Sequence, residues 1–151
     1  MSAIILVDTS VFLNLLDVPG RNENRQSILE TFREMIEVGD HFFLPMAAVI
    51  ETGNHIAHLA DGNQRRHYAK VFTKEVRQAL AGNSPWKPTN FQKKENILSY
   101  LDDFPDHAML GMTFADLTIV KEWEKTCARH PMSRVRIWAI DEHLCGYDRR
   151  V

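Results

Sequence analysis

The chain has 151 residues, of which 44% are hydrophobic and 25% are charged, with seven glycines and six prolines. This length allows one domain with a sizeable core, and the composition excludes a disordered chain. No apolar run approaches the length needed to span a membrane, so no membrane partner is expected. The 18 basic and 20 acidic residues give a net charge of −2, which excludes a uniformly basic nucleic-acid binder but leaves room for a local basic patch.

Segments with strand and helix patterns alternate along the chain. Short apolar runs favour buried strands, whereas apolar residues at every third or fourth position favour amphipathic helices. These patterns predict, in chain order, a strand at 4–7, helices at 11–16 and 24–39, a strand at 41–45, helices at 46–60 and 63–82, a very short strand at 84–89, helices at 90–102 and 113–130, and a strand at 135–141.

Glycines and prolines mark the ends of several of these elements. Pro19 and Gly20 form a turn after the first helix, and Gly39 and Gly82 follow two later helices at the position where glycine commonly ends a helix. We expect Pro105 to end the helix at 90–102. Strands that alternate with helices favour an α/β fold, in which a central parallel sheet has right-handed crossovers and helices on both faces.

Four carboxylates stand at points that such a fold brings together. In an open parallel sheet, ligands bind beyond the carboxyl ends of the strands. Asp8 and Asp141 each end a predicted strand, Glu51 lies in the helix after the second strand, and Asp116 lies at the start of the long helix. Because neighbouring strands are about 4.8 Å apart, side chains at two strand ends can lie side by side. We therefore expect the four acids to gather at one edge of the sheet.

A cluster of this kind favours a bound cation. Carboxylates that are held together repel one another, which raises their pKa values unless a cation neutralises them. Mg²⁺ and Mn²⁺ take oxygen ligands and are often shared between protein carboxylates and substrate phosphates. Such ions lower the pKa of a bound water and stabilise charge on a leaving oxygen, so the cluster favours phosphodiester hydrolysis without a Ser or His nucleophile.

Each acid also has a purely structural interpretation. Asp8 is well placed to cap the following helix, and Asp116 stands three residues after Thr113, close to a capping-box arrangement. Glu51 suits a solvated position on a helix, and Asp141 suits an ordinary turn after a strand. Only the joint placement of the four acids favours a functional site.

Four segments of the chain together resemble the PIN domain, the nuclease fold of the VapC-type toxins and of many RNA-processing proteins. They are VDTSVFLNLL around Asp8, AAVIETGNHI around Glu51, MTFADLTIVKEW around Asp116 and WAIDEHL around Asp141. The four segments span nearly the whole chain. The resemblance implies a single PIN-like domain over residues 1–151, built as a three-layer α/β/α sandwich with a central parallel sheet.

The resemblance also implies a catalytic site. Asp8 and Asp116 would be the core ligands of Mg²⁺ or Mn²⁺. Glu51 would be a ligand directly or through water, and Asp141 a second-metal or water-bridged ligand. Ser10 would hold the pocket through hydrogen bonds. The expected activity is that of a metal-dependent endoribonuclease that hydrolyses RNA. Separately, the lack of a membrane-length apolar run and of a signal-peptide pattern predicts a cytoplasmic location. The toxin of a type II toxin–antitoxin pair is the implied setting, with an antitoxin protein and a second copy of the chain as partners.

The sequence departs from the family pattern at one position and leaves other interpretations open. The family usually has Thr or Ser two residues before its last acid, where this chain has Ala139. A haloacid dehalogenase-like phosphohydrolase would use Asp8 as a nucleophile, but it needs a second Asp where Ser10 stands. A catalytically silent PIN-like scaffold that binds RNA or protein is the non-enzymatic alternative.

Further residues have weaker functional interpretations. Glu51, His55 and His58 share a helix face and could suggest zinc, although their spacing is not H-E-x-x-H. Cys127 and Cys145 lack a metal-binding spacing and are expected to be free thiols. Charge runs usually form solvated helix faces, and we assign none of them. The candidates for RNA contacts are Arg21, Arg25, Arg65, Arg66, Lys70, Lys93 and Lys94, with Trp86 and Phe91.

Overall fold

A computed structural model describes residues 2–151. Its strands are β1 (Ala3–Val7), β2 (His41–Leu44), β3 (Trp86–Pro88), β4 (Arg134–Trp138) and β5 (Asp148–Arg149). Its helices are α1 (Thr9–Leu15), α2 (Arg25–Glu37), α3 (Met46–Ala57), α4 (Gly62–Leu80), α5 (Lys94–Met109) and α6 (Phe114–Arg129). The five strands form one sheet in the order β3-β2-β1-β4-β5, and the pairs among β1 to β4 are parallel. The expected α/β fold with a mostly parallel central sheet is confirmed.

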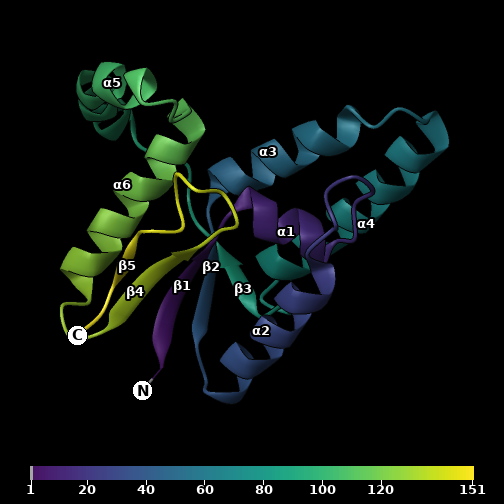
Figure 1. Ribbon diagram of the computed structural model, residues 1–151, viewed down its shortest axis with the longest axis horizontal. Coiled ribbons are helices and arrows are strands. Elements are labelled where there is room, and N and C mark those ends of the chain that lie inside the picture. The colour runs from purple at the N-terminus through teal and green to yellow at the C-terminus, as the bar shows by residue number, and fades with distance from the viewer. Residues whose placement is uncertain (1) are drawn as a thin grey trace.

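Strand β1 is the point where the strand order reverses (Figure 1). The chain proceeds from β1 to β2 and β3 on one side, and later places β4 on the other side of β1. All five residues of β1 are buried, which explains its unbroken aliphatic run. In open α/β sheets the ligand crevice forms beyond the carboxyl ends of the strands at such a reversal. Asp8, which directly follows β1, stands at this point.

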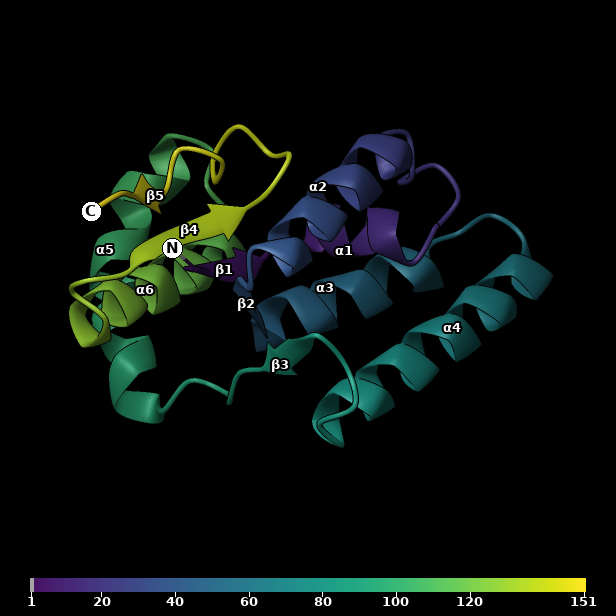
Figure 2. The same ribbon diagram turned by 90° about the horizontal axis from the view of Figure 1, so that it is seen from below.

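Helices lie on both faces of the sheet (Figures 1 and 2). On one face, Phe32 of α2 stacks on Trp86 and Trp138, with ring centroids 5.2 and 6.2 Å apart. On the other face, α6 contacts β4, and the indole Nε1 of Trp123 donates to the carbonyl of Val135 at 3.0 Å. Trp86, a candidate RNA contact, is therefore a core residue. These helices cover the two faces of the sheet. The edge at which the parallel strands end is left for a site.

Helices α3 and α4 lie side by side and extend beyond the sheet (Figure 2). Asp61 begins α4, where its side chain accepts a hydrogen bond from the backbone N–H of Gln64 at 2.8 Å. Gly53 faces the ring of Phe72, and a Cβ at this position would lie 3.6 Å from that ring, an ordinary van der Waals distance, so the contact between the helices does not depend on glycine. Helix α3 ends at Ala57, three residues earlier than expected.

Helix α5 corrects the expectation that Pro105 ends it, because the helix continues to Met109. Proline has a helical φ and removes one backbone donor, so the surrounding contacts decide whether a helix continues. Here the ring of Phe104 meets that of Phe114 edge-on at 5.1 Å. Asp103 is paired with Lys121 of α6 at 2.5 Å. These contacts hold the helix together around its proline.

The C-terminal part of the sheet also differs from expectation. Strand β4 ends at Trp138, so Asp141 lies in the following loop and not at the end of the strand. A short strand that the sequence pattern did not show, β5, pairs antiparallel to β4. Cys127 and Cys145 are free, as expected. Among residues 2–151, no helix combines the length and the apolar character that crossing a membrane requires.

Candidate functional site

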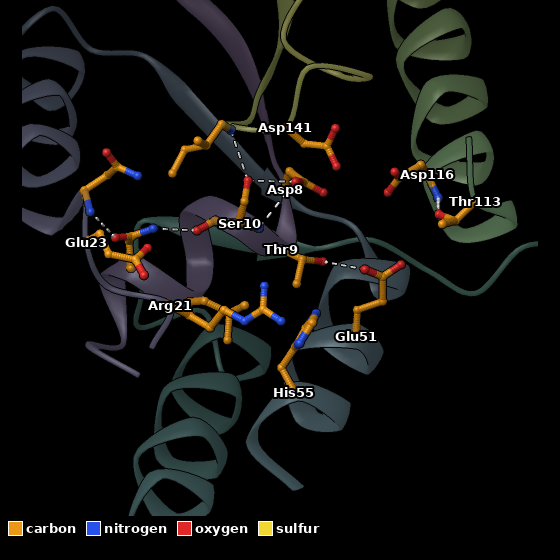
Figure 3. Close-up of a pocket in the computed structure, with 14 residues that line it drawn as sticks. Asp8, Thr9, Ser10, Arg21, Glu23, Glu51, His55, Thr113, Asp116 and Asp141 are labelled. Atoms are coloured by element: carbon orange, nitrogen blue, oxygen red, sulfur yellow. Dashed lines mark hydrogen bonds between the residues drawn. The ribbon is translucent and has the colours of Figure 1, made fainter. Parts of the chain in front are cut away.

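The four acids singled out in the sequence line one cleft of about 360 Å³ (Figure 3). Asp8 follows β1, Glu51 lies on α3, Asp116 lies in the first turn of α6, and Asp141 lies in the loop after β4. The parallel strands bring their carboxyl ends to the same edge, which places segments distant in sequence around one opening. The expected convergence of these side chains is therefore present in the structure.

Asp8 has one carboxylate oxygen with a structural role. Its Oδ2 caps α1 by accepting hydrogen bonds from the backbone N–H of Ser10 at 3.3 Å and from the Ser10 hydroxyl at 2.9 Å. The Ser10 hydroxyl oxygen accepts in turn from the backbone N–H of Ile140 at 3.0 Å. Ser10 thus joins the end of β1 to the loop that carries Asp141, the kind of role expected for it.

The other oxygen of Asp8, Oδ1, is buried and has no hydrogen-bond partner within residues 2–151. Burial raises the pKa of Asp8, and hydrogen bonds from Ser10 and from the backbone of Thr9 offset part of this rise. A buried acceptor without a donor costs free energy unless a ligand satisfies it. Asp8 is therefore held in a fixed orientation and keeps one oxygen available for a ligand.

Glu51 is a half-buried side chain on the α3 wall of the cleft. The hydroxyl of Thr9 donates to its Oε2 at 3.3 Å, which ties α3 to the start of α1. Burial raises the pKa of Glu51, the charge of Asp8 raises it further, and the hydrogen bond from Thr9 lowers it in part. Glu51 is therefore not the freely solvated side chain that its position in a helix suggested.

Asp116 is the acid whose ionisation the cleft changes most clearly. It is only 7% exposed, and its backbone N–H donates to the hydroxyl of Thr113, the N-cap of α6, at 3.1 Å. Burial, followed by the charges of Asp8, Glu51 and Asp141, raises the pKa of Asp116 to about 7. Near neutral pH this carboxyl group is divided between its protonated and ionised forms.

Asp141 stabilises a turn and also lines the acidic cleft. Its Oδ1 accepts from the backbone N–H of His143 at 2.8 Å, so the interpretation as a turn residue after a strand also applies. The charge of Asp141 nevertheless contributes to the raised pKa values of Asp8, Glu51 and Asp116. The charge of Asp141 therefore acts on the other three acids of the cleft.

The cleft also contains residues that the motif analysis did not place in the site. Arg21, Glu23 and His55 lie around the same opening as the acids (Figure 3). His55 follows Glu51 by one helical turn, which was a usable signal, whereas Arg21 and Glu23 lie in an irregular loop without one. Burial, and then the charge of Arg21, lowers the pKa of His55. His58 is not part of the lining, and its Nδ1 lies 2.6 Å from the carbonyl oxygen of Asn54 on its own helix.

The donors that the cleft offers are carboxylate oxygens. Hard divalent cations prefer carboxylate oxygens, and Asp8 Oδ1 is a buried oxygen without a partner. In the arrangement shown, no three His, Cys, Asp or Glu side chains among residues 2–151 form a group that could hold a metal ion. Glu51, His55 and His58, the residues considered for zinc, therefore form no such group either. A cation in this cleft therefore has to draw the carboxylates inward or contact some of them through its own waters, as Mg²⁺ commonly does.

Comparisons with known proteins do not place the chain in a family. No family model matches the chain, and no curated protein matches it. Among solved structures, the crystal structure of FitAcB from Neisseria gonorrhoeae is similar. It has 19% sequence identity, the match covers 91% of this chain and 87% of that chain, and the TM-score is 0.49. We draw no conclusion about activity from this likeness.

Proposed function

We propose that the chain is a metal-dependent endoribonuclease of the PIN kind, which hydrolyses RNA phosphodiester bonds with Mg²⁺ or Mn²⁺. The observation that carries the proposal is the convergence of four acids from separate segments on one cleft. Their mutual repulsion contributes to the raised pKa of Asp116, so the cluster opposes folding at neutral pH. Strongly shifted pKa values in a cleft are typical of functional sites.

In this proposal each acid has a separate role. Asp8 and Asp116 would hold the ion, Glu51 would be a ligand directly or through water, and Asp141 would be a water-bridged ligand or hold a second ion. When bound, the ion supplies a water of lowered pKa and neutralises charge on the leaving oxygen. Ser10 keeps the Asp8 carboxylate in a fixed orientation through its hydrogen bonds.

Two neighbouring side chains position the substrate and the acids. Thr9 restrains Glu51 through a hydrogen bond, so this carboxylate loses less conformational freedom when an ion binds. Arg21 is an exposed cation at the same opening, where a phosphate of the substrate would meet it.

The biological setting is a further part of the proposal. An antitoxin partner and a homodimer rest on the resemblance of the four segments to VapC-type proteins, and a cytoplasmic location is proposed with them. Light scattering of the purified chain measures the oligomeric state independently of any activity. A monomer at all concentrations would remove the dimer from the proposal and leave the nuclease proposal unchanged.

A silent scaffold that binds RNA or protein is the second candidate. It is favoured by the arrangement of the acids, which form no ready group of metal ligands within the described part of the chain. It is opposed by the cost of keeping four acids in one cleft. The scaffold predicts no cleavage with any ion, and this separates it from the nuclease.

The decisive experiment is cleavage of a panel of structured and unstructured RNAs. Purified protein is incubated with Mn²⁺, with Mg²⁺ and with EDTA, beside an Asp8→Asn variant and a matched Asp106→Asn control. Asp106 is an exposed acid on α5, outside the cleft lining. We expect metal-dependent cleavage by the wild type and the control and none by Asp8→Asn. Equal cleavage by all three proteins would indicate a contaminating nuclease, and no cleavage would favour the scaffold.

A further inference from the structure

A second hollow lies outside the acidic cleft, between α6 and the segment that joins β3 to α5. Figure 2 shows this segment passing beside α6. The hollow has a volume of about 260 Å³, and Leu6 and Phe43 of the sheet are among its lining residues. Lys93, Lys125 and Arg129 also line it. The exposed ring of Phe91, which also lines the hollow, and the cations beside it suit a ligand with a flat ring and a negatively charged group.

One carboxylate holds the wall of this hollow in place. Oε1 of Glu122 accepts hydrogen bonds from the hydroxyl of Thr89 at 3.0 Å and from Nε2 of Gln92 at 2.9 Å. Oε1 of Gln92 accepts in turn from the hydroxyl of Tyr100 at 3.0 Å. The segment between Thr89 and Gln92 is therefore restrained at both ends, and it presents Phe91 with 68% of the side chain exposed. An exposed aromatic ring on a restrained segment is prepared for stacking, because little entropy is lost on binding.

The charge of the hollow is opposite to that of the acidic cleft. Lys93, Lys125 and Arg129 stand against one carboxylate, that of Glu122. None of the three cations forms an ion pair with a carboxylate among residues 2–151; the ammonium of Lys125 lies over the ring of Tyr100, 5.3 Å from its centroid. Unpaired cations beside an exposed aromatic ring are the combination that binds single-stranded nucleic acids.

The hollow and the acidic cleft lie along the same helix, since Glu122 lines the hollow and Asp116 lines the cleft. Glu122 and Asp116 are six residues apart on α6, a rise of about 9 Å along the helix axis. A third, more apolar hollow is also lined by Phe91 and Glu122, and its other wall includes Ile50, the neighbour of Glu51 on α3. The third hollow thus adjoins the cationic hollow and reaches the residue that precedes Glu51, although it shares no lining residue with the acidic cleft.

We propose that the hollow between α6 and the β3–α5 segment binds one nucleotide of single-stranded RNA, with Phe91 stacked on the base and Lys93 and Arg129 on phosphates. The assignment rests on the proposed function, since it places the substrate of the acidic cleft. The volume of about 260 Å³ lies just below the range of about 300–1,000 Å³ that is common for ligand sites, so the hollow takes no more than one nucleotide. An acidic protein segment would use the cations and leave the ring of Phe91 without a partner.

The test measures binding of a fluorescein-labelled oligo(rU) 12-mer by anisotropy, in EDTA so that no strand is cut. The variants are Phe91→Ala, Phe91→Trp and the double variant Lys93→Ala with Arg129→Ala. The matched charge control is Lys74→Ala with Arg77→Ala, which removes two exposed cations of α4 that line neither the acidic cleft nor the hollows beside α6. Thermal melts establish that each variant is folded, which is expected because the substituted side chains are exposed.

The expected result is a rise in Kd of about tenfold for Phe91→Ala, the size that loss of one stacked base produces, with wild-type affinity kept by Phe91→Trp. The double variant Lys93→Ala with Arg129→Ala should lower the slope of log Kd against log salt by about 1.4, because two phosphate contacts are lost. The charge control should leave this slope unchanged.

Other outcomes overturn the assignment. Equal slopes for the two double variants would mean that only total charge matters, and an unchanged Kd for Phe91→Ala would exclude stacking. Polyglutamate that competes as well as RNA would assign the hollow to an acidic protein segment. If the wild type still cleaves RNA while these variants bind and cleave as it does, only the nucleotide site fails. If the wild type neither binds nor cleaves RNA, the proposed function fails with it.

Discussion

Replacing Asp116 with asparagine tests whether the acids of the cleft destabilise the fold. Asparagine has nearly the same shape and cannot ionise, so the substitution removes a buried charge and keeps the packing of α6. The folded chain raises the pKa of this group from 3.8 to about 7, so it holds a proton that the unfolded chain releases. Between about pH 4 and pH 7 the wild-type free energy of unfolding therefore falls as pH rises. The variant lacks this loss and should be more stable at pH 8 in EDTA.

The size of the effect follows from the pKa. A rise of about three pKa units corresponds to about 4 kcal/mol, at 1.36 kcal/mol per unit. A carboxylate in the first turn of a helix is stabilised by about 0.5–1 kcal/mol, which the variant loses. We expect a net gain of about 3 kcal/mol at pH 8, or roughly 6–12 °C in Tm for a domain of this size. At pH 5.5 the gain should be smaller by about 2 kcal/mol, because wild-type Asp116 is then protonated in the folded state.

Urea denaturation and thermal melts followed by circular dichroism measure this difference at pH 5.5 and pH 8, with EDTA present. Asp106→Asn is the control, since it removes an exposed acid on α5 and should change the free energy of unfolding by less than about 0.5 kcal/mol. An Asp116→Asn variant that is less stable than the wild type at pH 8, or whose gain is the same at both pH values, would refute the electrostatic reasoning.

Three further predictions concern the metal, the hydrogen bonds of the cleft and the core. Mn²⁺ should raise the Tm of the wild type and not that of Asp8→Asn. The affinity of the wild type for Mn²⁺, measured by calorimetry, should fall from pH 8 to pH 6, because Asp116, with a pKa of about 7, takes up a proton that competes with the ion. Ser10→Ala should lower the free energy of unfolding by about 1–2 kcal/mol in urea titrations, since Asp8 loses a donor and the N–H of Ile140 loses its acceptor; no loss would mean that water replaces the hydroxyl. Phe12→Ala should cost about 3–5 kcal/mol in the same assay, because this ring is fully buried, and a cost below 1 kcal/mol would contradict its place in the core.

The elements of the fold were largely predictable because their patterns are local. A strand covered on both faces must be apolar throughout, and residues 4–7 show this in a few letters of sequence. The continuation of α5 past Pro105 was not predictable, because the residues beside this proline contact α6, which is a separate segment of the chain. The two-residue strand β5 is too short to leave a periodic pattern.

The acids of the site were predictable because a general rule places the carboxyl ends of parallel strands at one edge. Asp8, Glu51, Asp116 and Asp141 could be named without any coordinates. Arg21 could be named only as one basic residue among several. Its loop has no periodicity, and its place beside the acids follows from how the loop packs against the rest of the chain.

The sequence alone determined where most strands and helices lie and which carboxylates stand near strand ends, since each depends on a residue and its close neighbours in the chain. Tertiary structure decided which charges share a cavity. It placed the acids together, so that burial and repulsion raise the pKa of Asp116, and it set Lys93 and Arg129 beside Phe91 in a separate hollow. These groupings join residues far apart in the chain, and the strand order and helix packing that create them are properties of the whole fold.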